Sequence, residues 1–326
     1  MGRFLRNSRG MALILTILII SLIVSLTLQF NISMRSDLHA AVNLRDGVKL
    51  GYIARSGFNY ALAVLSEDDS GVDSLHDTWA DPKTFSENSA ALFDDGRFEV
   101  KVSDHSGRIQ INKLILDNGN YDSDQKGLLM RFLKSPEFGL EEEEVNDIVD
   151  AVKDWIDKDD DPTGLGGAEN SYYQTLEKPY SCKNAPIEFL EELLLVKGIT
   201  RELFYGTKEK PGVSNYLSPH GEGGVNINTA APVVLRAFSD DIDDEMVKDM
   251  DKYRTAKEDE EGLSDPKWYK KVLGMSHVTI ANELLTTSST HFEITSKGFK
   301  EAMARQVTGM VKRKEDKFDL LSWKIE

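Results

Sequence analysis

The chain has a single cysteine, Cys182, among its 326 residues. One thiol cannot form an internal disulfide. A folded part lying outside the cytoplasm would therefore depend on a hydrophobic core, a metal or partners for its stability. For Cys182 itself only a free thiol or an intermolecular link remains, and a free thiol without a special role is the simpler interpretation.

Basic residues are also few, with 39 Lys and Arg against 55 Asp and Glu, which gives a net charge of −16. Because nucleic acids attract positively charged surfaces, this balance argues against a nucleic-acid partner. Catalytic patterns are missing as well: no Gly-x-Ser-x-Gly motif occurs, and the six histidines show no metal-binding spacing. The sequence therefore favours a protein without enzymatic activity.

Charge is absent from Met11 to Phe30. A helix of about 20 residues rises roughly 30 Å, which matches the hydrocarbon core of a bilayer. The preceding residues include Arg3, Arg6 and Arg9 but no acidic residue, so residues 11–30 are predicted to span a membrane with a cytoplasmic N-terminus. The bulk of the chain would then lie on the other side.

A secretory signal peptide is the alternative for this segment, but no small-x-small cleavage site follows Phe30. The junction Arg9-Gly10-Met11 instead resembles the leader of type IV pilins and type II secretion pseudopilins. By that resemblance, residues 1–10 are a leader, prepilin peptidase cuts after Gly10, and Met11 becomes the methylated N-terminus. A plain single-pass anchor stays open on this motif alone.

Leu15 departs from most pilins, which carry Glu at mature position five. That carboxylate can compensate the N-terminal ammonium of a neighbouring subunit, where an unpaired buried charge is costly. A subunit with Leu15 cannot offer this group, so it suits the end of a filament better than its repeating body. Among pseudopilins, the missing Glu is typical of the minor subunit K.

The helix is predicted to continue over residues 31–66, where no proline occurs. Apolar residues recur there at helical spacing, which predicts a face that packs on a folded domain: Leu44, Val48, Tyr52, Phe58, Leu62 and Leu65. Alternating patterns predict strands at 98–102, 109–111, 291–295 and 305–311, the first two as a hairpin around 104–107. We expect these strands to form one antiparallel sheet on which the helix lies.

These elements predict an α+β fold. A β domain would comprise residues 67–112 and 290–326, and residues 113–289 would form a mostly α-helical insertion. Within the insertion, Ser123 could cap a helix through Lys134, and a strongly apolar face predicts another from about 141 to 156. Further helices are predicted at 186–196, 230–238, 243–256 and 277–285.

An acidic segment follows the second of these helices. Asp157, Asp159 and Asp161, with a Gly-rich bend and Glu169, could surround a hard cation with oxygen ligands, as Ca²⁺ requires. The segment is not an EF-hand, because Pro162 stands where the loop needs Gly. Spacing alone leaves open a solvated acidic loop without metal.

A second informative segment contains Gly224, Asn226, Asn228 and Thr229. The pattern Gly-x-aliphatic-amide-Ile-Asn occurs at 107–112 and again at 223–228. Asn228 or Thr229 could cap a helix that Pro232 helps to begin. The segment resembles the first turn of helix-hairpin-helix modules, some of which bind DNA, but the acidic residues at 240–245 would repel phosphates.

The run from Asp154 to Tyr173, then Lys178-Pro179-Tyr180 and Asn184-Ala185-Pro186, closely resembles the minor pseudopilin K family of bacterial type II secretion systems. In that family the corresponding acidic segment binds calcium. The resemblance therefore implies Ca²⁺ as the bound ion and Asp157, Asp159, Asp161 and Glu169 as its ligands. It also implies a pilin-like fold with an inserted domain.

The resemblance further implies a structural role at the tip of the pseudopilus, in which the protein starts assembly for the export of folded proteins. The implied partners are minor pseudopilins I and J, the major pseudopilin filament, the inner-membrane assembly platform and prepilin peptidase. The implied location is the inner membrane, with a periplasmic C-terminal part. A tip adhesin of a type IV pilus and a membrane-anchored DNA receptor are the alternatives.

Overall fold

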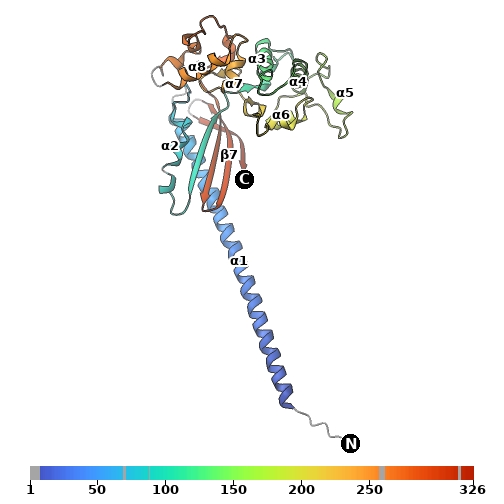
Figure 1. Cartoon of the computed structure of the whole chain (residues 1–326), viewed down its shortest axis with the longest axis vertical. Helices are drawn as coiled ribbons and strands as arrows, with labels where there is room; N and C mark the ends of the chain where they lie inside the picture. The colour runs from blue at the N-terminus through green and yellow to red at the C-terminus, as the bar shows by residue number, and fades with distance from the viewer. Residues whose placement is uncertain (1–7, 69–70, 88, 257–260, 315–316) are drawn as a thin grey trace.

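The computed structural model describes residues 8–68, 71–87, 89–256, 261–314 and 317–326. Its dominant element is the helix α1 (Ser8–Glu67), 60 residues long. Its first part projects away from the rest of the molecule, and its last part lies against a sheet (Figure 1). The predicted continuation of the apolar helix beyond the membrane segment is confirmed. The leader residues 1–7 lie outside the described residues.

Four antiparallel strands form the sheet on which α1 packs. They are β1 (Arg97–Asp104), β6 (His291–Lys300), β7 (Met303–Lys314) and β8 (Lys317–Ile325), in the order β1-β6-β7-β8. The apolar residues of α1 and of the sheet's inner face share one core, which contains Leu50, Ile53, Ala54, Phe58, Ala61, Leu65, Phe98, Val100, Phe292, Ile294, Val307 and Val311. The predicted α+β arrangement of a long helix on an antiparallel sheet is confirmed.

The predicted hairpin between 98–102 and 109–111 is wrong. Strand β1 pairs with β6, whereas β2 (Ile109–Gln110) pairs in parallel with β3 (Leu217–Ser218). Ile109 and Ile111 are buried in the core of the insertion. The alternation of apolar and polar residues at 109–111 therefore arises from burial in a different core from the one that buries β1. The fourth strand of the sheet is β8, which the sequence pattern missed because most of its side chains are exposed.

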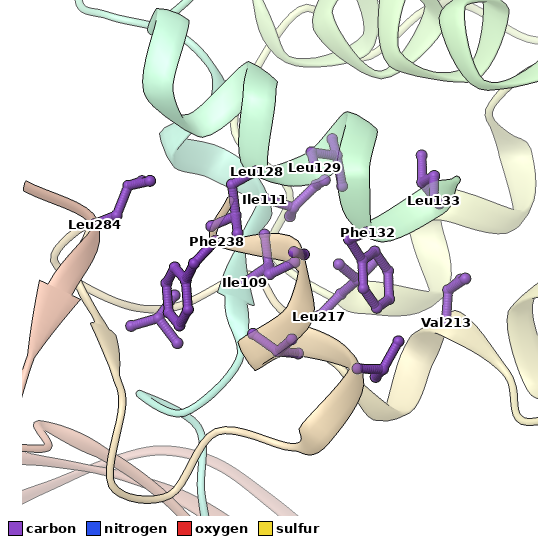
Figure 2. Packing of buried hydrophobic residues seen from close by; sticks show 14 of the residues in the cluster. Ile109, Ile111, Leu128, Leu129, Phe132, Leu133, Val213, Leu217, Phe238 and Leu284 are labelled. Atoms are coloured by element: carbon purple, nitrogen blue, oxygen red, sulfur yellow. The ribbon is translucent and has the colours of Figure 1, made fainter. Parts of the chain in front are cut away.

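The insertion has its own hydrophobic core, part of which Figure 2 shows around Ile109, Leu128 and Phe132. The helices and strands of the insertion and of its connections are α2 (Pro82–Ser86), α3 (Ser123–Leu133), α4 (Glu142–Ile156), α5 (Asn170–Tyr173), α6 (Arg201–Tyr205), α7 (Pro232–Ala237), α8 (Asp244–Thr255), β4 (Val225–Asn226) and β5 (Leu285–Thr286). Several 3₁₀ turns link them, at Thr78–Ala80, Ser89–Ala91, Ile111–Leu114, Leu190–Leu195, Val213–Asn215, Glu261–Ser264, Trp268–Lys271 and Asn282–Leu284.

Helix α4 shows why the apolar pattern was informative. Its predicted face is buried throughout, and three glutamates occupy its first turn, where the helix dipole favours negative charge. Other details of the helix predictions are wrong. Asp122, not Ser123, caps α3, since its carboxylate accepts the N–H of Asp124 and Gln125. The regions 186–196 and 277–285 contain only short 3₁₀ turns, Leu190–Leu195 and Asn282–Leu284.

Candidate functional site

The first candidate site is the apolar part of α1. Within the described residues it is the one helix long and apolar enough to cross a membrane, and its apolar part is not buried against the rest of the chain. Gly10 and Met11, the predicted cleavage junction, lie inside this helix, and Leu15 follows on the same exposed segment. The helix is compatible with a single-pass membrane anchor.

Beyond the membrane segment, α1 exposes a second apolar face. Leu44, Val48 and Tyr52 are 72%, 54% and 67% exposed. The sequence pattern grouped them with Phe58 and Leu65 as one buried stripe, and that grouping is wrong. The sheet covers only the opposite side of the helix, where Leu50 is fully buried, so the face formed by Leu44, Val48 and Tyr52 has no cover within the described chain. We call it the free face of α1.

The second candidate site is the acidic segment after α4. Carboxylate oxygens of Asp157, Asp159 and Glu169 lie within 4.8 Å of one another. Asp157 and Glu169 are buried, at 1% and 0% exposed. One oxygen of Asp157 and both oxygens of Glu169 have no hydrogen-bond partner in the described part of the chain. Buried carboxylates without donors are costly, and a bound cation would remove that cost.

The electrostatics of this group agree with its geometry. Burial, together with the nearby charge of Asp154, raises the pKa of Glu169 to about 8. Burial also raises the pKa of Asp157, although Lys153 Nζ lies 2.5 Å from its Oδ2 and opposes the shift. The donor set is therefore all oxygen and crowded with negative charge, which is the chemistry that Ca²⁺ prefers.

Asp161 does not join this group. It is exposed, and its backbone N–H donates to Asp159 Oδ1 at 3.0 Å, so its role is to shape the loop. Asp154 is the acidic residue that sequence spacing overlooked. It is fully buried in α4, and both of its carboxylate oxygens accept the N–H of Thr163 at 3.1 Å. The sequence did contain a signal for it, because Asp154 lies about one helical turn before Asp157 and so on the same side of the helix.

The loop is tightly closed around these carboxylates. A Cβ on Gly167 would lie 2.4 Å from Asp154 Oδ2 and 2.4 Å from Thr163 O, so only glycine fits there. Asn170 Nδ2 donates to Asp160 Oδ1 at 2.8 Å across the loop. A cleft of about 470 Å³ is lined by Asp157 and Asp159 on one side of the group.

The segment with Gly224, Asn226, Asn228 and Thr229 is a buried joint. Asn226 and Asn228 are fully buried, and Trp268 Nε1 donates to Asn228 Oδ1 at 2.8 Å. The predicted capping role is wrong, since α7 begins after Ala231 without a side-chain cap. In this arrangement the two asparagines face the interior of the protein.

The two repeated sequence patterns lie side by side at this joint. The N–H of Asn226 donates to Ser106 O at 2.8 Å, and Gln110 Nε2 donates to Gly224 O at 2.8 Å. A Cβ on Gly107 would lie 2.5 Å from Thr229 Oγ1, which explains the glycine that opens the first pattern. The joint therefore fixes the insertion to the end of the sheet.

Three comparisons with known proteins give a consistent result. A family model described as type II secretion system (T2SS), protein K matches residues 107–207. The chain is similar to the type II secretion system protein K of Pseudomonas aeruginosa, with 28% identity covering 72% of this chain and 68% of that protein. It is similar to the protein K of Aeromonas hydrophila, with 29% identity covering 70% of this chain and 69% of that protein.

A solved structure is similar in fold. A chain in the crystal structure of the GspK-GspI-GspJ complex from the type 2 secretion system of enterotoxigenic Escherichia coli superposes with a TM-score of 0.64. The identity is 16%, and the match covers 87% of this chain and 98% of that one. At this identity the likeness shows a shared fold.

Proposed function

Because this chain is a relative of the type II secretion system protein K, we propose that it is the non-enzymatic minor pseudopilin at the tip of a type II secretion pseudopilus. In this role it starts pseudopilus assembly with minor pseudopilins I and J. The observation that carries the proposal is the arrangement of the chain: the long helix α1 has an uncovered face, and a large insertion lies at the end of the sheet away from the N-terminus (Figure 1).

The physical reason concerns stacking. Subunits of a helical filament pack through their long helices, and the free face of α1 offers the apolar surface for such packing. An insertion at the end of the sheet away from the N-terminus would collide with a subunit stacked above it. A subunit at the tip has nothing above it. The absence of a carboxylate at Leu15 fits the same position.

The proposal includes a location and a calcium ion. The apolar part of α1 would anchor the chain in the inner membrane after cleavage behind Gly10, with the folded part in the periplasm. Asp157, Asp159 and Glu169 would hold Ca²⁺, and the ion would fix the loop between α4 and α5. The charge supplied by the ion would compensate three clustered carboxylates, which otherwise repel one another.

The test uses this chain and I- and J-type pseudopilins, each purified with its helix in detergent and mixed for light-scattering chromatography. A discrete complex of all three is expected. Val48→Lys, on the free face of α1, should weaken it, because a lysine there would be buried without a partner. Asn43→Lys adds the same charge at an exposed polar position and is the matched control.

If no complex forms with or without calcium, the tip assignment is wrong, and an adhesive minor pilin of a type IV pilus becomes the better candidate. If Val48→Lys and Asn43→Lys weaken the complex equally, the free face is not the contact surface. Folding of both variants is checked by circular dichroism before mixing.

A further inference from the structure

A large cleft of about 890 Å³ lies between the sheet and the insertion. Residues of the sheet alternate between its two faces, and Phe292, Ile294 and Val307 face α1. Glu293 and Met310 therefore lie on the opposite face, which forms one wall of the cleft. The other wall comes from the insertion.

The insertion wall contains exposed aromatic side chains. Phe189 and Tyr205 are 61% and 52% exposed, and Leu321 of β8 is 42% exposed beside them. A cleft of several hundred Å³ with aromatic walls and a few polar groups is typical of small-ligand sites. Because this cleft lies on the face of the sheet opposite α1, its use would not depend on helix packing in a filament.

The polar end of the cleft contains Arg108, His105 and Glu293. Within the described residues, no carboxylate lies within salt-bridge distance of the Arg108 guanidinium, and no side-chain hydrogen bond is formed by it. Burial lowers the pKa of Arg108, and the charges of Glu293 and Asp104 oppose this shift. The other cation of the lining, Lys324, is paired with Glu326 at 2.5 Å. Arg108 is thus a partly buried cation on which Glu293 and Asp104 act only from beyond salt-bridge distance, so its guanidinium has no carboxylate in direct contact within the described residues.

His105 is 4% exposed, and its Nε2 has no hydrogen-bond partner in the described part of the chain. The Ser218 hydroxyl donates to His220 O at 2.9 Å, so at 3.2 Å it accepts the proton of His105 Nδ1. Burial and the charge of Arg108 lower the pKa of His105 well below its ordinary value, so its ring is neutral. The bare Nε2 is therefore a hydrogen-bond acceptor.

Glu293 Oε2 lies 3.8 Å from His105 Nε2. Two acceptors at this separation can share one donor nitrogen that lies within hydrogen-bond distance of both. The polar end of the cleft thus combines a place for a nitrogen donor with a cation for a carboxylate. The exposed aromatic residues line the same cleft.

We propose that this cleft binds an apolar residue with a free α-carboxylate, with the carboxylate on Arg108, the adjacent nitrogen between His105 and Glu293, and the side chain against Phe189 and Tyr205. The same chemistry is present in the carboxyl-terminal residue of a peptide and in a free amino acid. Exposed Glu188 and Glu191 at the rim disfavour ligands with further negative charge.

The test is isothermal titration calorimetry on the full chain in lipid nanodiscs. The probes are L-phenylalanine and N-acetyl-L-leucyl-L-phenylalanine, each compared with its carboxyl-terminal amide. At least one acid should bind about tenfold more tightly than its amide, because only the acid can pair with Arg108. Binding of the dipeptide acid alone would identify a peptide end as the ligand, and binding of phenylalanine alone a free amino acid.

Arg108→Gln should make the affinities of acid and amide equal. Arg236→Gln removes an arginine with a surface ion pair to Asp244 and is the matched control. Phe189→Ser changes an exposed position, where folding is little affected. This variant should weaken the binding of the acid and of the amide by the same factor. Equal binding of acid and amide by the unmodified chain, no binding of any probe, or full binding by Phe189→Ser would overturn the proposal.

Discussion

The guanidinium of Arg313, on β7, donates from Nη1 to both carboxylate oxygens of Asp73 at 2.8 and 3.0 Å. Asp73 is fully buried, and its backbone carbonyl accepts hydrogen bonds from Asn226 at 3.0 Å and Asn228 at 3.2 Å. One ion pair thus joins the sheet, the connection after α1 and the asparagine segment of the insertion.

Arg313→Met should lower the free energy of unfolding by about 3 kcal/mol, because it leaves the Asp73 carboxylate buried without its cation. Lys312→Met, at the neighbouring position, breaks a more exposed pair with Glu222 and should cost less than about 1 kcal/mol. Urea unfolding followed by tryptophan fluorescence measures both. Similar losses in the two variants would contradict the role of the buried pair.

Two glycines of α1 should respond to alanine in opposite directions. A Cβ on Gly57 would lie 2.4 Å from Ser296 Oγ and 2.8 Å from Phe98 Cγ, so Gly57→Ala should destabilise the chain by about 1–3 kcal/mol through overpacking. Gly51 has open space, so Gly51→Ala should stabilise the helix by up to about 1 kcal/mol. Thermal unfolding measures the change in stability of each variant. Changes of the same sign in the two variants would contradict this packing.

Calcium should raise the unfolding temperature of the chain, and a chelator should reverse the increase, because an ion bound only to the folded state stabilises it by mass action. Asp157→Asn with Glu169→Gln should abolish the response to calcium. Glu177→Gln changes an exposed carboxylate of the same region, and this variant should keep the response to calcium. Differential scanning calorimetry with and without calcium makes the measurement, and an unchanged response in the double variant would exclude these ligands.

The stability that His291 contributes should be lost in mild acid. Burial lowers the pKa of His291 from 6.5 to about 4 in the folded state. Between these values the unfolded chain binds a proton that the folded chain does not, so this group alone lowers the free energy of unfolding by roughly 2.5 kcal/mol as the pH drops from 6.5 to 4. The charged groups that face His291 are Lys312 and Glu222. The ring of His220 stacks on the ring of His291, with the two ring centroids 5.8 Å apart.

Urea titrations from pH 7 to pH 4 measure this effect. His291→Gln should reduce the pH dependence, and His39→Gln, on the exposed part of α1, should leave it as it was. His105, whose pKa is also lowered by burial, accounts for part of the remaining slope. Burial raises the pKa values of Glu169 and Asp73, and these groups oppose the slope in both chains. Equal changes in stability between pH 7 and pH 4 in the unmodified chain and in His291→Gln would contradict the prediction.

The sequence alone determined the elements whose signal is local. The uncharged run in α1, the apolar face of α4 and the alternation in β1 and β6 each follow from a periodicity that the chain carries within one element. The acidic segment was also visible, since Asp157 and Glu169 lie at the two ends of one loop, between α4 and α5. For these features, composition and spacing contain the physical information.

Only the tertiary structure decided what depends on distant segments. Strand β8 has mostly exposed side chains, so its place in the sheet comes from pairing with β7 and not from burial. Asn226 and Asn228 resemble helix-capping residues in the sequence. In the fold they are buried, and their side chains donate hydrogen bonds to a backbone carbonyl more than a hundred residues away. The free face of α1 also depends on distant segments, because the sheet covers one side of the helix and leaves the other side exposed within the described residues.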